Sequence, residues 1–436
     1  MKLWRMQIIA VLAWTAAADV GAEDMLALYK EALGSDAQFQ AAQSQYESIL
    51  ERVPQSRAAL LPALTLDGNT ISNNNSSNTF GSQNYNSHGY SVRLTQPLFR
   101  WDAKIARDQT LTLVQQAEAE LALARQDLIL RVSQAYFGVL LAEDALKALQ
   151  TEKTAVGEEM AAAQRRFEIG TANITDVRDA KSRHDLVTAQ EIAAQNELAA
   201  KREEIRRITR RQPSSIAPLR GGIQLAGPAP ADIDSWVASA EQDGLGVIAG
   251  QAALEIARLE TLKARGGRYP RVDLTANVGE SKSATINTVG TDLNDSSVGV
   301  QFSVPLYSSG AIRARQRETA LLLDKSSAEL DDARRSSGLS ARQAYLTATS
   351  GLALVGALQE ALVSANTALQ ANRRGLEIGV RANIDLLNAQ KQVSETERDL
   401  ARARYDTLLS LLKLKAAAGR LAETDVREIN ALLEAK

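Results

Sequence analysis

The stretch RRFEIGTANITDVRDA, residues 165–180, returns later in the chain as RRGLEIGVRANIDLLNA, residues 373–389. Each stretch has the pattern of one helix ending at a glycine and a second helix starting shortly after it, with an aspartate six residues beyond the glycine. A turn that occurs twice in the same local sequence is a sign of an internal repeat, and repeats of this kind decide the whole architecture.

Further matches show that the repeated unit is large. TQPLF at 95–99 corresponds to SVPLY at 303–307, which is 208 residues later, and Tyr136 corresponds to Tyr345, which is 209 residues later. The two turn glycines, Gly170 and Gly379, are also 209 residues apart. The sequence therefore predicts a tandem duplication of one unit of about half the chain.

The duplication gives a domain organisation in which each copy has helices, two strands and a long helical hairpin, in that order. The segment 212–233 is rich in Pro and Gly and reads as a linker between the copies. The predicted segments are a signal peptide (1–22), a first repeat (23–211, with strands in 62–99 and the hairpin in 101–210), the linker (212–233), a second repeat (234–420, with strands in 270–307 and the hairpin in 310–418) and a C-terminal helical segment (421–436).

The hairpins are unusually long. The first long helix, 101–168, would span about 100 Å at 1.5 Å per residue, and the second is expected at 310–377. Helices returning from the turns are expected at 174–210 and 382–418. The first long helix carries a strict heptad, which predicts left-handed supercoiling against its neighbours. The heptad residues are Leu121, Leu128, Ala135, Ala142, Leu149, Val156 and Ala163.

The N-terminal residues predict a secreted protein, and the composition excludes several other classes. Lys2 and Arg5 precede a mostly apolar run that ends in small residues, which is the pattern of a secretory signal. The 436 residues include no cysteine, so no disulfide, thiolate metal site or lipidated cysteine is expected, and the net charge of −2 does not suggest nucleic acid. Beyond the signal, the sequence shows no apolar run near the roughly 18 to 20 residues that a membrane helix needs, so any membrane contact is expected through strands.

The strand segments alternate between apolar and polar residues, as in VDLTANVG (272–279) and VGVQFSV (298–304). Strands with one apolar and one polar face are typical of outer-membrane barrels, although a soluble hairpin packed on the helices has the same pattern. The polar segments 72–89 and 280–297 are predicted to be extracellular loops. Four strands in one chain would leave edges that lipid does not tolerate, so several chains must close one barrel.

Aromatic residues and prolines mark the strand ends. Pro97 and Pro305 are expected where a strand bends and continues into a long helix, because proline cannot donate to a sheet ladder. The aromatic residues are predicted to form an interfacial girdle. They are Tyr90, Phe99, Trp101, Tyr269 and Tyr307.

With these motifs in their order, the chain resembles the TolC family of outer-membrane efflux proteins over essentially its whole mature length. The resemblance implies a mixed fold of α-helices plus a transmembrane β-barrel, in which a homotrimer closes a twelve-stranded barrel set on an α-helical tunnel. It also implies a location in the outer membrane of a Gram-negative bacterium, in contact with its lipid and extending into the periplasm. The implied partners are a periplasmic adaptor protein and an inner-membrane pump or ATP-driven exporter, and the implied function is the exit duct of an efflux or type I secretion system. The hairpin turns would then be the far ends of the tunnel.

The resemblance assigns roles to residues at the turns. The family's closed end is held by an arginine after the second turn and a Thr-Asp pair after the first, and the matching residues are Arg381, Thr175 and Asp176. An arginine–carboxylate bond is directional and suits such a latch. The turns themselves, at Gly170, Thr171, Gly379 and Val380, are the expected adaptor-docking sites.

Two positions depart from the family pattern. A latch tyrosine corresponds to Leu376, so one hydrogen bond is missing. The acidic ring of the pore retains Asp385, whereas its second position is Asn388, so repulsion and cation binding there should be weaker. Asp179 is a candidate to restore part of that charge.

An enzyme is not expected, and neither a cofactor nor a metal is. His88, expected in a loop, and His184, expected on a helix, have no metal or triad spacing, and no phosphate-binding glycine loop occurs. The alternative function is a secreted periplasmic coiled-coil adaptor or structural protein without a pore, for which the heptads alone would suffice. The cargo, whether drugs or proteins, is left open.

Overall fold

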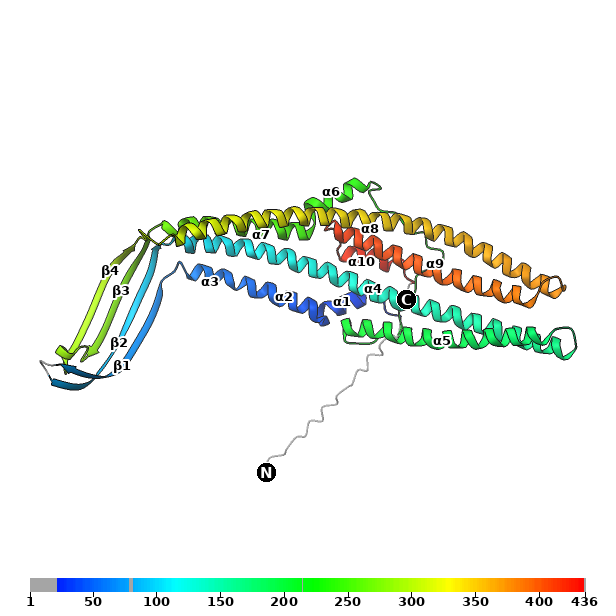
Figure 1. Cartoon of the computed structure of the whole chain (residues 1–436), viewed down its shortest axis with the longest axis horizontal. Helices are drawn as coiled ribbons and strands as arrows, with labels where there is room; N and C mark the ends of the chain where they lie inside the picture. The colour runs from blue at the N-terminus through cyan, green and yellow to red at the C-terminus, as the bar shows by residue number, and fades with distance from the viewer. Residues whose placement is uncertain (1–21, 78–80, 214, 435–436) are drawn as a thin grey trace, which may run out of the picture.

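The computed structural model describes residues 22–77, 81–213 and 215–434, so the predicted signal peptide lies outside the described residues except for its last position. Figure 1 shows a long body in which a sheet stands at one end and two helical hairpins turn at the other. The predicted fold class, long helices combined with a sheet of amphipathic strands in two similar copies, is confirmed.

The two copies contribute the same kinds of elements in the same order. In the first copy these are α1 (Met25–Ser35), α2 (Ala37–Leu50), α3 (Arg52–Ala58), β1 (Ala63–Ser77), β2 (Gly81–Phe99), α4 (Trp101–Glu168) and α5 (Ile174–Thr209). In the second copy they are α6 (Ile233–Asp243), α7 (Leu245–Arg265), η1 (Gly266–Arg268), β3 (Arg271–Lys282), η2 (Ile286–Thr288), β4 (Asp292–Ser303), α8 (Ala311–Glu377) and α9 (Asn383–Ala417). A last helix, α10 (Glu423–Asn430), follows near the middle of the body.

The heptad of α4 forms a buried stripe. Six of its seven residues, from Leu128 to Ala163, are buried, and Leu121 at its start is half-buried. The stripe packs because α4 contacts α5 along the hairpin, α7 and α2 toward the sheet, and α9 of the second hairpin. Its many alanines let these helices approach closely.

The main hydrophobic core lies around the middle of α4. In this core, α1, α10 and the segment between the copies pack against the two hairpins. The hydroxyl of Tyr136 donates to the carbonyl of Ala217 (2.7 Å), and its repeat counterpart Tyr345 donates to Ala231 (2.8 Å). Both acceptors lie in the predicted linker, so two equivalent tyrosines fix that segment at both ends. Burial raises the pKa of Tyr136.

An ion pair beside this core connects α4 to the start of α2. Arg131 of α4 donates to both oxygens of Asp36, at 2.8 and 2.9 Å, and Asp36 accepts the backbone N–H of Phe39 at the start of α2. These hydrogen bonds to the charged form lower the pKa of Asp36.

The four strands form one antiparallel sheet in the order β1-β2-β3-β4. The register places Leu66 opposite Val92 and Val92 opposite Val278, so the alternating apolar residues share one face. Most of this apolar face is exposed, whereas the opposite face carries polar rows such as Asp67, Ser91, Gly279 and Asp295. The exposed apolar side chains are Leu64, Leu66, Tyr90, Val92, Val278, Val298, Val300 and Phe302.

The predicted loops are mostly wrong. β1 extends to Ser77 and β2 starts at Gly81, so nearly all of 72–89 is strand, and β3 and β4 leave only residues 283–291 between them. The period-two rule missed these extensions because both faces are polar there. For the same reason Tyr90 lies within β2 and not at its end. It lies on the apolar face, in the row next to that of Val92, and its hydroxyl donates to Glu280 (2.7 Å).

The other predicted aromatic residues lie where the sheet meets the helices. Trp101 packs edge-on against Tyr269, with ring centroids 5.4 Å apart. Pro97 falls at a register irregularity in β2, and Pro305 follows the end of β4. Each proline therefore comes where a strand leaves the regular ladder before a long helix.

One described helix, α8, contains a stretch long and apolar enough to cross a membrane, which the sequence analysis did not find. The stretch combines alanine, leucine and valine with few charges, without a continuous apolar run. Only 11% of it is buried in the single chain.

Candidate functional site

Each hairpin turns at a glycine with a left-handed backbone. Gly170 has φ of 79° and Gly379 has φ of 78°. In both turns the glycine N–H bonds back three residues and the next N–H bonds back five, from Thr171 to Arg166 and from Val380 to Gly375. This arrangement satisfies the last carbonyls of the helix and requires a residue that adopts positive φ without strain.

The aspartate after each turn caps the returning helix. The N–H of Asn173 donates to Asp176 Oδ2 (3.0 Å), and the N–H of Ala382 donates to Asp385 Oδ2 (3.3 Å). Asp176 and Asp385 are 209 residues apart, so they are equivalent positions of the duplication. This local role explains why both turns carry the aspartate, and in the first turn the spacing of Asn173 and Asp176 is the sequence signal of a capping box.

Arg381 lies across a glycine that the sequence analysis did not single out. A Cβ atom on Gly375, which is buried in α8, would approach Arg381 Cγ to 2.6 Å. Glycine at this position therefore lets the arginine stem lie against the helix. The side chain of Arg381 is 59% exposed, and its Nη1 lies 3.8 Å from Asp385 Oδ2.

In the single chain the predicted latch residues are brought to the tips but not joined. Thr175 is exposed and Asp176 is half-buried at the start of α5. Arg381 pairs with Asp385 of its own hairpin, and no hydrogen bond or ion pair between Arg381 and the Thr175–Asp176 pair occurs among the described residues.

The two hairpins of one chain touch near their tips through other residues. Arg166 of α4 pairs with Glu159 and also donates to Asn383 Oδ1 of α9 (3.4 Å). Leu386 and Leu387 are buried beside this contact. The two leucines and Leu376 also line a groove of about 580 Å³ between α4, α8 and α9. Leu376 thus adds an apolar wall at the position where the resemblance led us to expect a tyrosine.

The predicted acidic ring is represented by one carboxylate. Asp385 is partly buried because it caps α9, whereas Asn388, three residues later, is exposed. The side chain of Asp385 is therefore shared between the helix end and Arg381.

The extreme ends of the tips are apolar. Ile169 and Ile378 are each 74% exposed, and Val380 is 70% exposed. Thr171, the counterpart of Val380, donates its hydroxyl to the carbonyl of Arg166 (3.1 Å). The four predicted docking positions lie in these turns, where apolar side chains are available to a partner.

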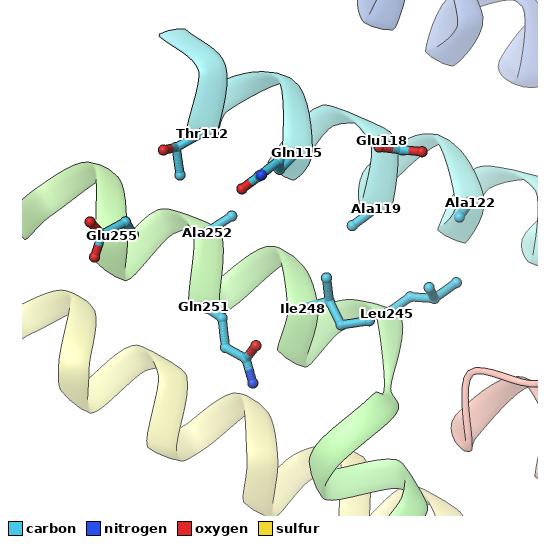
Figure 2. Close-up of a pocket in the computed structure, with 10 residues that line it drawn as sticks. All are labelled: Thr112, Gln115, Glu118, Ala119, Ala122, Leu245, Ile248, Gln251, Ala252 and Glu255. Atoms are coloured by element: carbon cyan, nitrogen blue, oxygen red, sulfur yellow. The ribbon is translucent and has the colours of Figure 1, made fainter. Parts of the chain in front are cut away.

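A second groove lies far from the tips, between α4 and α7. Figure 2 shows Leu245 and Ile248 of α7 pointing toward Ala119 and Ala122 of α4 across a space of about 570 Å³. The residues at this groove form no cluster of converging polar groups, and it reads as a gap between small helix side chains.

The histidines take no part in these sites. His88 lies in β2 and not in a loop, and His184 lies in α5 beside Gly157. Among residues 22–77, 81–213 and 215–434 no three His, Cys, Asp or Glu side chains are grouped as metal ligands.

Comparison with known proteins finds relatives of the same architecture. The model of the family described as "Outer membrane efflux protein" matches residues 28–209 and again 237–420. The chain is 31% identical to "Outer membrane protein TolC" of Vibrio cholerae over 96% of each chain. It is 32% identical to "Alkaline protease secretion protein AprF" of Pseudomonas aeruginosa, covering 94% of this chain and 88% of that protein. The crystal structure of the Campylobacter jejuni CmeC outer membrane channel has the same fold, with a TM-score of 0.79 at 14% identity over 95% of this chain and 91% of that one.

Proposed function

This chain belongs to the outer membrane efflux protein family, and from that premise we propose that three copies of it form one exit duct that is gated at its hairpin tips. It is an outer-membrane channel of efflux or type I secretion, it extends into the periplasm, and it is not an enzyme. The alternative of a periplasmic coiled-coil adaptor without a pore does not account for the amphipathic sheet.

The observation that carries the function is the sheet with an exposed apolar face and an opposite polar face at one end of helices about 100 Å long. An apolar outer face suits lipid and a polar inner face suits a water-filled passage. Three copies supply twelve strands, and the exposed apolar surface of α8 would be covered by the neighbouring copy.

The duplication supports a latch between copies. Within the chain, α4 meets α9 where Arg166 contacts Asn383. The counterparts 209 residues away are Gly375 of α8 and Ile174 of α5. In a ring built from alternating hairpins, Gly375 of one copy would therefore adjoin Ile174 of the next.

That arrangement would bring the predicted latch together. The stem of Arg381 lies on Gly375, and Thr175 and Asp176 directly follow Ile174. The arginine of one copy would then bond the Thr-Asp pair of the next copy when the duct is closed. On release, Arg381 would return to Asp385 of its own chain, the partner it has in the isolated chain. With Asn388 beside it, the ring of three Asp385 carboxylates would bind cations weakly.

The hairpin turns are proposed as the docking site of a periplasmic adaptor, with an inner-membrane pump or ATP-driven exporter behind it. The exposed apolar side chains of Ile169, Ile378 and Val380 support contact with a partner. The relatives include both a TolC and a protease secretion protein, so the cargo would be selected by the pump.

Replacing Gly379 with alanine is expected to weaken adaptor docking without unfolding the hairpin. No atom lies within 4 Å of the added Cβ, so the cost is backbone strain at positive φ, about 1–2 kcal/mol. Crosslinking to the adaptor in cells should fall several-fold. Gly356→Ala is the matched control, because this glycine also has open space but lies inside α8 with negative φ. Wild-type crosslinking by Gly379→Ala would contradict the docking role of the turn.

The direct test of the duct is single-channel recording of the purified protein in a planar bilayer. We expect a small, steady conductance, because the barrel is open through the membrane while the tips are closed. Protein that inserts as an oligomer and conducts no ions would exclude the proposed duct.

A further inference from the structure

The sheet of one chain has two unpaired edges. β1 and β4 are its first and last strands, and every residue of β4 is exposed. Backbone groups at such edges cannot remain unpaired inside a membrane.

The duplication specifies how these edges can pair. β1 and β2 pair with Ala63 opposite Thr95, and β3 and β4 pair with Arg271 opposite Ser303. Both members of the second pair are 208 residues beyond those of the first. The two hairpins therefore have the same register, and a single offset relates all four strands.

When β4 pairs with β1 of the next copy, in the register that β2 makes with β3 inside the chain, we propose that this seam between copies lacks the polar lock of its internal counterpart. The inference rests on the proposed closed oligomer. Inside the chain Val92 stands opposite Val278. The same offset puts Val300 opposite Thr70 of the next copy and Gln301 opposite Asn69 of the next copy.

This register keeps the two faces of the sheet continuous. Val300 and Thr70 both lie on the apolar face of the sheet, and Gln301 and Asn69 both lie on the opposite, polar face. A shift by one residue would turn the apolar residues of β4 to the polar face, so only shifts of two compete with it.

The seam inside the chain is locked where the sheet meets the helices. Arg100 donates to both oxygens of Asp273 at 2.9 Å, and Arg271 donates to Asp102 at 3.0 Å. Trp101 packs on Tyr269 and donates its indole N–H to the carbonyl of Leu262 (3.3 Å).

The short helix η1, which precedes β3, leaves room for the side chain of Trp101. A Cβ atom on Gly266 would come within 1.9 Å of the indole ring, so glycine is required there.

The seam between copies has none of these groups. The counterparts of Arg100 and Asp273 are Ser308 and Thr65, and those of Asp102 and Arg271 are Gly310 and Ala63. Trp101 and Tyr269 correspond to Ser309 and Leu61. Around the barrel, seams with two ion pairs would therefore alternate with seams that have no ion pair at these positions.

Cysteine pairs test the register without background, because the chain has no cysteine. The double variant Gln301→Cys with Asn69→Cys should form covalent oligomers on a non-reducing gel. The matched pairs Gln301→Cys with Asp67→Cys, or with Ile71→Cys, face the same side but are shifted by two residues and should form few. Stronger crosslinking by a shifted pair would overturn the register.

Light scattering on the same samples measures the oligomeric state and so tests the closed oligomer separately from the strand register. Monomers that form no oligomer would reject the proposed closed oligomer itself, whereas oligomers crosslinked in a shifted register would reject only this inference.

Transplanting the lock tests the difference between the seams. The double variant Ser308→Arg with Thr65→Asp should raise the temperature at which the oligomer separates into monomers, by on the order of 2–4 °C. Ser308→Asp with Thr65→Asp, which places like charges together, should lower it. A transplanted lock that leaves the separation temperature unchanged would overturn the claim that the seam lacks one.

Discussion

Replacing Arg381 with serine is expected to raise the single-channel conductance several-fold, because the proposed latch of the closed tips is lost. Each solvated arginine–carboxylate pair contributes about 0.2–1 kcal/mol, so three equivalent latches contribute about 0.6–3 kcal/mol. A free-energy change of that size multiplies the ratio of open to closed channels by roughly 3 to 150. Cells carrying the variant should also become sensitive to bulky antibiotics that the closed duct excludes.

The control for this experiment is an arginine nearby that the latch does not use. Arg374 is exposed in the last turn of α8, and Arg374→Ser removes the same charge at almost the same height. It should leave the conductance near the wild-type value, and Arg381→Lys should give an intermediate one because lysine lacks the planar fork. Equal conductance of Arg381→Ser and wild type, at equal protein abundance, would move the gate elsewhere.

Replacing Glu152 with alanine is expected to have the largest effect on stability. Glu152 of α4 is only 1% exposed and accepts a hydrogen bond from Arg183 of α5, whose side chain is 16% exposed. Removing one partner of a buried pair leaves the other charge uncompensated, at a cost of about 3–5 kcal/mol. The midpoint of thermal unfolding, followed by circular dichroism, should fall by roughly 10 °C.

Two controls identify the cause. Glu191→Ala breaks a more exposed pair of the same hairpin, Lys153–Glu191, and should cost less than about 1 kcal/mol. Changing both Glu152 to Leu and Arg183 to Met removes the pair without leaving a lone charge and should recover most of the stability. Similar midpoints for Glu152→Ala and Glu191→Ala would show that the burial of the pair does not matter.

The sequence predicted the helices well because their signals are local and repeated. The heptad from Leu121 to Ala163 and the glycines of the two turns each fix a helix face or end by short-range chemistry. The duplication then doubled every such signal, so an ambiguous element in one copy could be judged from the other.

The sequence predicted the strands only where lipid imposes alternation. From Asn73 to Ser77, asparagine and serine carry no period and are poor strand formers, yet they continue β1 because β2 pairs with them. Strand pairing of this kind depends on a partner many residues away, which a local pattern does not record.

At the tips, sequence reasoning named residues of the two turns but missed the contacts that hold them. Asp176 and Asp385 received different roles, although they are equivalent positions that each cap a helix. Gly375 was overlooked because its importance comes from the stem of Arg381 lying on it, a contact that needs the folded turn.

The lock formed by Arg100, Asp273 and Trp101 stands at one end of a helix whose other end reaches the proposed gate. A helix of this length acts as a lever: a rotation of about 5° at the sheet moves the tip by roughly 9 Å, given an arm of about 100 Å. That displacement is several times the reach of a hydrogen bond. The stiffness of the joint at the membrane surface thus sets how accurately the tips can meet, and a substitution beside the lipid can make the duct leak at its far end.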